Sequence, residues 1–247
     1  MSDSTGERRR VALVTGANKG IGREVARQLA VAGFTVIATA RDAERGGAAV
    51  RELVAEGAGD LRFLRLDVTD QETVAEAARF VETNFAGLDV LVNNAGITGI
   101  TRGQRKELDE LTVDDLRAPL ETNFVGVFAV TQAMLPMLRK ASGRVVNLTS
   151  TLATFGRVVK EGPQRADLLP YLTAKAAANM ASVVYAAALR EAGVTVHAVS
   201  PGYIATDMNN FAGTKSVEEG ARVVVGVATT GELPERALLV ESGTLPW

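Results

Sequence analysis

The chain contains no cysteine and only one histidine, His197, among its 247 residues. The lack of cysteine excludes disulfides, thiolate catalysis and cysteine-ligated zinc, and it agrees with the cytoplasmic location that we expect. The lone histidine stands inside an apolar run, where a hydrogen-bonded core residue is the simplest interpretation. Because the sequence also has no G-x-S-x-G elbow, a Ser-His-Asp hydrolase is disfavoured.

Charge of one sign and long apolar runs are also scarce. The formal net charge is −2, so no global field would attract nucleic acid or an anionic membrane, and we expect neither as a partner. The first apolar run, Val11–Val14, is too short for the core of a signal peptide or for a membrane span. Residues 1–10 are mostly polar and are expected to form a flexible tail.

Short apolar runs alternate with helical patterns along nearly the whole chain, which predicts βαβ units around a parallel sheet. Because no linker or repeat divides the chain, we predict one domain over residues 1–247. Its expected fold is a Rossmann-type, doubly wound α/β fold of seven mostly parallel strands with helices on both faces. The predicted strands are Val11–Val14, Val36–Thr39, Leu61–Leu66, Asp89–Val92, Val145–Leu148, Val194–Val199 and Ala237–Val240. The predicted helices are Gly20–Ala32, Ala43–Glu56, Gln71–Phe85, Val113–Lys140, Tyr171–Ala192 and Val217–Ala228.

A glycine-rich turn, Gly16-x-x-x-Gly20-x-Gly22, follows the first predicted strand and opens a helix. Glycines at such a turn let the backbone approach a pyrophosphate, and the helix N-terminus supplies N–H groups and positive potential. The spacing differs from G-x-G-x-x-G, so the turn alone is also compatible with a plain strand–helix connection.

Polar residues with catalytic chemistry are expected at the same edge of the sheet. Asn93, Ser150 and Pro201 each follow the carboxyl end of a predicted strand, where open parallel sheets bind ligands. Tyr171 and Lys175 are four residues apart, so a helix places a phenol and an ammonium group on one face. A proton donor beside a dinucleotide makes a hydride-transfer enzyme the leading hypothesis.

A set of short motifs appears in a fixed order from Val11 onward. The motifs are T-G-x-x-x-G-I-G at Thr15 to Gly22, N-N-A-G at Asn93 to Gly96, Asn123, Ser150, Y-x-x-x-K at Tyr171 and Lys175, and P-G followed by a threonine at Pro201, Gly202 and Thr206. In these motifs the chain resembles the classical type of the short-chain dehydrogenase/reductase family. Each motif alone is weak evidence, whereas the whole set in register is specific.

The resemblance implies that Asn123, Ser150, Tyr171 and Lys175 are the catalytic residues. Tyr171 would be the general acid or base, Ser150 would bond the reacting oxygen, and Asn123 would help to seat a water in a proton relay. We expect Lys175 and an oxidised nicotinamide to favour the phenolate, whose ordinary pKa is about 10. The implied cofactor contacts are Gly16, Asn18, Lys19, Gly20, Ile21, Gly22, Arg41, Asp67, Val68, Asn93, Ala95, Gly96, Tyr171, Lys175, Pro201, Gly202, Ile204 and Thr206.

The choice between NAD and NADP depends on the end of the second predicted strand. An NAD site places an acid there for the ribose 2′-hydroxyl, whereas this chain has Ala40 followed by Arg41, with Lys19 in the glycine turn. Two cations suit a 2′-phosphate and favour NADP(H), and the pattern is most similar to NADP-dependent carbonyl reductases of the family. The alternative, that Asp42 binds the ribose and the cofactor is NAD, remains open.

The chain departs from the common family pattern in two places. Residues 152–170 are an expected inserted loop near the active site, and the segment after Thr206 is a short substrate lid. Because of these two departures, the sequence does not decide whether the protein is a monomer or a homo-oligomer. The pocket walls are expected at 97–100, 152–155 and Tyr203, which are mostly apolar. The sequence thus predicts an NADPH-dependent ketone or aldehyde reductase, with an NAD-dependent secondary-alcohol dehydrogenase or a non-catalytic dinucleotide sensor as alternatives.

Overall fold

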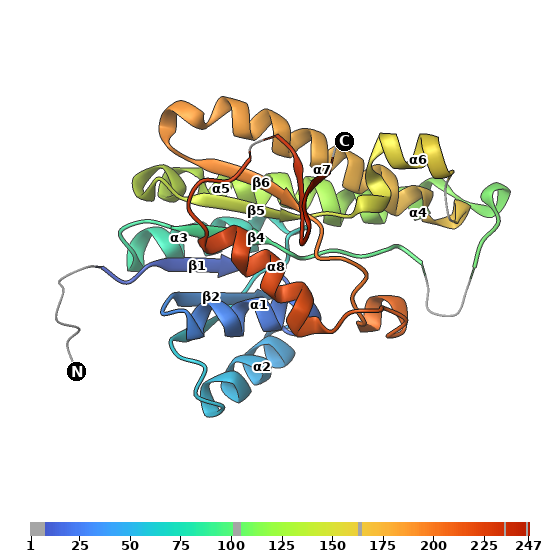
Figure 1. Ribbon diagram of the computed structural model, residues 1–247. Coiled ribbons are helices and arrows are strands. Elements are labelled where there is room, and N and C mark those ends of the chain that lie inside the picture. The colour runs from blue at the N-terminus through green and yellow to red at the C-terminus, as the bar shows by residue number, and fades with distance from the viewer. Residues whose placement is uncertain (1–7, 101–104, 163–164, 235, 246) are drawn as a thin grey trace.

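The computed structural model describes residues 8–100, 105–162, 165–234, 236–245 and 247, and within these residues eight strands form a single sheet (Figure 1). The strand order is β3-β2-β1-β4-β5-β6-β7-β8, and all neighbours are parallel except the antiparallel pair β7–β8. Because β1 pairs with both β2 and β4, the strand order reverses there, and ligands of such sheets bind at this switch point. The strands are β1 Val11–Val14, β2 Thr35–Ala40, β3 Leu61–Arg65, β4 Val90–Asn93, β5 Arg144–Leu148, β6 Thr195–Val199, β7 Leu238–Val240 and β8 Gly243–Leu245.

The predicted α/β class is confirmed, but the predicted number of seven strands is wrong. The additional strand, β8, is three residues long and forms a hairpin with β7 at the edge of the sheet. All three of its residues are exposed. A strand this short and this exposed carries no apolar alternation from which it could be recognised.

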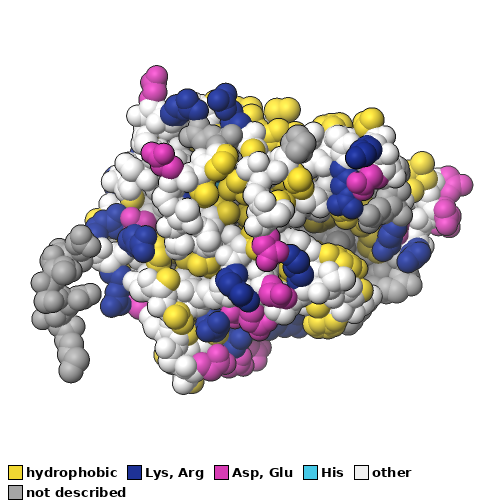
Figure 2. Space-filling view, viewed as in Figure 1, with side chains coloured by type: hydrophobic (Ala, Val, Ile, Leu, Met, Phe, Trp, Pro, Cys, Tyr) yellow, Lys and Arg dark blue, Asp and Glu magenta, His cyan; other side chains and the backbone are white. Residues whose placement is uncertain are grey.

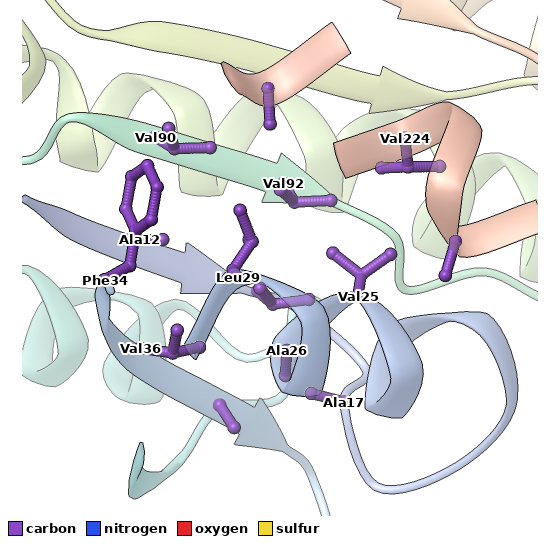
Figure 3. Packing of buried hydrophobic residues seen from close by; sticks show 14 of the residues in the cluster. Ala12, Ala17, Val25, Ala26, Leu29, Phe34, Val36, Val90, Val92 and Val224 are labelled. Atoms are coloured by element: carbon purple, nitrogen blue, oxygen red, sulfur yellow. The ribbon is translucent and has the colours of Figure 1, made fainter. Parts of the chain in front are cut away.

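Helices cover both faces of the sheet. On one face, α1, α2 and α8 pack over a core that includes Leu29, Phe34 and Val224; Figure 3 shows these side chains between the strands and the helices. On the other face, α3, α5 and α7 cover a second core. His197 in β6 is 3% exposed, which confirms a core position. The helices are α1 Gly20–Val31, α2 Ala43–Ala55, α3 Gln71–Asn84, α4 Val113–Leu120, α5 Gly126–Ala141, α6 Phe155–Glu161, α7 Leu169–Ala188 and α8 Val217–Thr229.

The helical stretch predicted at Val113–Lys140 is interrupted by one widened turn. A π-helical turn, Glu121–Val125, joins α4 to α5 and contains the predicted catalytic residue Asn123. The turn follows Pro119, which lacks a backbone N–H and disturbs the hydrogen bonding of the preceding helical turn. Single π turns of this kind occur often at functional sites.

The predicted inserted loop at 152–170 is more regular than expected. It contains the 3-10 turns Thr151–Ala153 and Ala166–Leu168, helix α6 between them, and the first residues of α7. Gly156 lies inside α6 and Gly162 directly follows it, so the sequence of this short helix does not read as a helical pattern. The expectation of an irregular loop is therefore corrected.

The predicted flexible tail is corrected for its last three residues. Residues 1–7 lie outside the described residues. Arg8 forms two hydrogen bonds of 2.7 and 2.8 Å with Asp89, and the guanidinium group of Arg10 lies 4.2 Å from the ring centre of Phe34. These contacts anchor the chain directly before β1.

Positive and negative side chains are mixed on the surface seen in Figure 2, where Lys and Arg lie among Asp and Glu without an extended patch of one sign. This mixture agrees with the small net charge. Among the described helices, none has the length and apolarity that crossing a membrane would require.

Candidate active site

The glycine turn between β1 and α1 forms a backbone cradle. Gly16 and Gly20 have φ values of +66° and +54°, which favour glycine because a side chain would be strained there. A Cβ atom on Gly22 would lie 2.3 Å from the side-chain amide of Asn94, so this position has no room for a larger residue. Asn18 and Ile21 are partly exposed in the same turn.

The first turn of α1 is open to a ligand. Within the described part of the chain, the N-cap residue Lys19 makes no side-chain capping hydrogen bond, whereas Asp42 and Asp70 cap α2 and α3. The N–H groups at the start of α1 therefore have no side-chain acceptor and can bind a pyrophosphate. The close backbone of the glycine turn and the N–H groups at the start of α1 together fit the pyrophosphate of a dinucleotide.

Asn94 holds the glycine turn against the end of β4. Its side-chain amide donates to the carbonyl oxygens of Thr15 (2.8 Å) and Gly16 (3.1 Å), and its backbone N–H donates to Thr15 Oγ1 (3.0 Å). The backbone N–H of Ala95 donates to the same hydroxyl at 3.0 Å. The sequence predicted Asn93, Ala95 and Gly96 as site residues. It did not predict Asn94, whose hydrogen bonds connect the glycine turn to the end of β4.

The side chain of Asn93 points away from the glycine turn. Its amide donates to Thr131 Oγ1 (3.0 Å) and Asn147 Oδ1 (2.8 Å), and Asn147 donates to Ser182 at 2.9 Å. This buried network lies on the face that α5 and α7 cover. Asn93, the last residue of β4, and Asn94, directly after it, thus direct their side chains to different segments. For Asn93, only the main chain remains available to a ligand.

Ser150, Tyr171 and Lys175 converge at the carboxyl end of β5. Tyr171 and Lys175 lie on α7, with the ammonium nitrogen 5.9 Å from the centre of the phenol ring. Burial raises the pKa of Tyr171 to about 12 and outweighs a hydrogen bond from Ser150 that lowers it. This direction differs from the expected stabilisation of the phenolate. In the protein alone, Tyr171 is thus a neutral phenol that holds its proton.

The side chain of Lys175 is buried, and a hydrogen bond holds its ammonium group at the end of β5. Its ammonium group donates to the carbonyl oxygen of Leu148 at 2.7 Å, and the residue is 6% exposed. Burial lowers its pKa to about 8. A Cβ atom on Gly96 would lie 3.6 Å from the ammonium nitrogen, so Lys175 lies beside the segment that follows β4.

Asn123 is fully buried, and its side-chain amide is hydrogen-bonded. It donates to the carbonyl oxygen of Ile97 and accepts from the N–H of Ile97, both at 2.8 Å. The side chain therefore positions the segment 96–98 next to Lys175. These two bonds use one N–H group and one lone pair of the amide, and the second N–H group and the second lone pair remain unused within the part of the chain that the structure describes.

The outer end of the candidate cofactor site lies at the ends of β2 and β3. Burial raises the pKa of Asp67, but hydrogen bonds from Thr69 and the charges of Arg41 and Arg65 outweigh it and lower the pKa; Arg41 itself is exposed. Asp42 accepts a hydrogen bond of 3.0 Å from the N–H of Arg45 and so caps α2. Val68 is buried against Gly126 of α5.

The chain after β6 turns back toward the glycine turn. Pro201 is buried and Gly202 is exposed at the end of the strand. The side chain of Ile204 packs against Gly220 of α8, where an added Cβ atom would lie 2.7 Å from it. Ile204 therefore offers a ligand its main chain only.

The short lid contacts the glycine turn. A Cβ atom on Gly20 would lie 3.6 Å from the methyl group of Thr206, and the ammonium group of Lys19 pairs with Asp207. In this structure Lys19 is thus paired with Asp207, whereas Arg41 and Arg65 both lie near Asp67 at the outer end. The structure brings the glycine turn, the segment after β4, the predicted catalytic residues and the predicted lid to one edge of the sheet.

Comparison with known proteins places these features in a family. Residues 10–217 match the family model described as short chain dehydrogenase. A short-chain dehydrogenase of Penicillium roqueforti is 35% identical over 231 residues, covering 90% of each chain, and carbonyl reductase [NADPH] 1 of Sus scrofa is 34% identical over 284 residues, covering 96% of this chain and 94% of that protein.

Solved structures agree with this match. A carbonyl reductase from chicken fatty liver, solved with NADPH bound, is 29% identical, with a TM-score of 0.83 over 98% of this chain and 100% of the other. Sequence, family model and fold lead to one conclusion. The chain belongs to the short-chain dehydrogenase/reductase family of oxidoreductases, and it is of the classical type.

Proposed function

We propose that the protein is an NADPH-dependent reductase that transfers hydride to a ketone or aldehyde, with Tyr171 as the proton donor. The observation that carries the proposal is the convergence of Ser150 and Lys175 on Tyr171 at the sheet edge that also holds the glycine turn. When bound, NADPH would supply the hydride. The residues of this chain would orient the carbonyl and manage the proton.

Tyr171 would donate its phenolic proton to the oxygen that becomes the alcohol. With a pKa of about 12, the phenol is fully protonated near neutral pH and can act as an acid in every turnover. The Ser150 hydroxyl would donate a hydrogen bond to the same oxygen and stabilise its developing negative charge. Lys175, held by the Leu148 carbonyl, would keep a positive charge near the phenol as the proton leaves.

The preference for NADPH over NADH is supported by the ends of β2 and β3. Asp42, the candidate ribose acid of an NAD enzyme, is used as the N-cap of α2 and lies within 3.4 Å of Arg45. Arg41 is exposed and offers a cation for a 2′-phosphate. The named ligand of two relatives, NADPH, agrees with this preference.

The test is NADPH consumption with a panel of aromatic, aliphatic, cyclic and quinone carbonyls, run in parallel with NADH. Tyr171→Phe is expected to lower kcat by about 10²–10⁴, the usual share of a positioned acid, with an unchanged Kd for NADPH. Tyr185→Phe on the same helix is the matched control, because its hydroxyl has no hydrogen-bond partner among the described residues. Full activity of Tyr171→Phe would refute the proposal, as would faster turnover with NADH.

A further inference from the structure

A pocket lies between the segment that follows β4 and the start of α7, and its wall is more polar than the sequence led us to expect. It is enclosed by the segment that Asn123 holds after β4 and by the residues that lead into α7. Its lining residues are Thr98, Gly99, Ile100, Lys106, Leu111, Asp115, Asp167 and Pro170. The segment that follows β4 joins the pocket to the candidate catalytic residues, because it runs from Gly96, beside the ammonium group of Lys175, to Thr98 in the pocket wall.

One side of the pocket carries an ion pair between Lys106 and Asp115. The ammonium group donates to both carboxylate oxygens, at 2.7 and 2.6 Å. Asp115 also completes the capping box of α4, because its carboxylate accepts from the backbone N–H (2.8 Å) and the hydroxyl group (2.7 Å) of the N-cap residue Thr112. These bonds, that from Lys106 first, lower the pKa of Asp115 to about 2. The carboxylate is thus anionic and already supplied with donors.

The other side carries a second ion pair, between Asp167 and Arg165. The Asp167 side chain is only 6% exposed. Its carboxylate accepts two hydrogen bonds from the guanidinium group of Arg165, one of 2.9 Å from Nε and a second from a terminal nitrogen. The hydrogen bond from Arg165 lowers the pKa of Asp167, as does the nearby charge of Arg105. A buried carboxylate beside the pocket therefore fixes the direction of a half-exposed guanidinium group.

Counting donors and acceptors shows what this wall can offer to a ligand. An ammonium group has three N–H donors and a guanidinium group has five, and each of these two groups gives two to its carboxylate. Both carboxylates are satisfied by the protein, whereas Lys106 and Arg165 retain unused donors. The charged lining residues are Lys106, Asp115 and Asp167, and Arg165 and Arg105 act on Asp167 from beside the pocket, so three cations offset two carboxylates in this cluster of described residues. The wall therefore favours a ligand group that is anionic and accepts hydrogen bonds.

We propose that the carbonyl substrate carries a carboxylate, which binds Lys106 and Arg165 while the carbonyl group meets Tyr171 and Ser150. This inference rests on the proposed function and narrows its substrate class to oxo acids. A planar carboxylate can accept two parallel hydrogen bonds from a guanidinium group. Asp115 and Asp167 act as positioning residues, because they hold the charged groups of Lys106 and Arg165 in place.

The test compares oxo acids with their methyl esters and amides, which keep the carbonyl and the size but lack the charge. For the wild type, we expect kcat/KM to be about tenfold higher for the acids, the effect of one charge-assisted hydrogen bond from a partly exposed group. Lys106→Gln and Arg165→Gln should each remove most of this preference through KM, and leave the esters and the Kd for NADPH unchanged. Lys160→Gln, an exposed lysine of α6 outside the pocket, is the matched control.

The outcomes separate this inference from the proposed function. Equal kcat/KM for acids and esters in the wild type would overturn the inference alone, as would variants that slow both classes equally. No NADPH-dependent reduction of any acid, ester or amide would overturn the proposed function with it. If Arg165→Gln fails to fold because Asp167 is left buried without its partner, Lys106→Gln decides, since Asp115 keeps its bonds from Thr112. High salt should also weaken the acid preference of the wild type.

Discussion

Replacing Lys175 by methionine is expected to stabilise the folded protein at neutral pH while it abolishes turnover. The ammonium group is buried, and burial lowers its pKa to about 8. The ordinary pKa of a lysine, which applies in the unfolded chain, is 10.5, so at neutral pH the folded state holds this charge at a cost in stability. Methionine keeps much of the volume of the side chain and removes the charge.

The magnitude follows from the two pKa values. A lysine pKa lowered from 10.5 to about 8 corresponds to about 3 kcal/mol of lost stability at pH 7 and about 1 kcal/mol at pH 9.5. The cost shrinks with rising pH because only the unfolded chain still binds the proton in this range. Methionine also forfeits the bond to the Leu148 carbonyl, worth about 1 kcal/mol net, so we expect a gain of about 2 kcal/mol at pH 7 and almost none at pH 9.5.

The assay is urea unfolding of the cofactor-free wild type and variant at both pH values, followed by circular dichroism. The stability difference between the two proteins should fall by about 2 kcal/mol from pH 7 to pH 9.5. Tyr171 stays protonated in the folded state over this range because its pKa is about 12. Lys160→Met, at an exposed position, should show no such pH dependence. A stability difference for Lys175→Met that does not change with pH would refute the reasoning.

Two further predictions concern the cofactor site. Arg41→Gln is expected to raise the Kd for NADPH about tenfold in fluorescence titrations and to leave that for NADH nearly unchanged, with a smaller effect for Lys19→Gln, whose ammonium group already pairs with a lid carboxylate. Equal weakening of both cofactors would instead favour Asp42 as a ribose ligand. Gly22→Ala is expected to abolish binding of both dinucleotides and to lower the free energy of unfolding by about 1–3 kcal/mol, because the added methyl group overlaps a neighbouring amide. A Gly22→Ala protein that binds NADPH normally would contradict the assignment of the cradle.

The sequence was sufficient for the fold class and for the edge at which the candidate site lies. Apolar runs followed by polar residues identify strand ends, and parallel strands bring those ends together. The four-residue spacing of Tyr171 and Lys175 likewise fixes their common helix face. The strand β8 and helix α6 escaped prediction because each is short and exposed, so tertiary contacts rather than a periodic pattern determine them.

The direction of individual side chains was harder to predict. Asn93 and Asn94 are adjacent in one motif, yet one enters a buried network and the other ties the glycine turn. The two-residue period of a strand was an available signal for this division. The Lys19–Asp207 pair and the effect of burial on Tyr171 were not available, since both depend on how distant segments pack.

The parts of the candidate site are joined by a small number of hydrogen bonds between elements. These bonds explain why polar residues without an evident chemical role stand among the motif residues. Asn94 ties the cofactor cradle to the end of β4, Asn123 ties the next residues of that segment to the π-helical turn, and Lys175 ties α7 to the end of β5. Each of these bonds comes from a buried or partly buried amide or ammonium group and is specific in direction. The residues that define the family motifs thus include several that fix backbone positions, so a change at Asn94, Asn123 or Lys175 would disturb the part of the site that its own bonds hold.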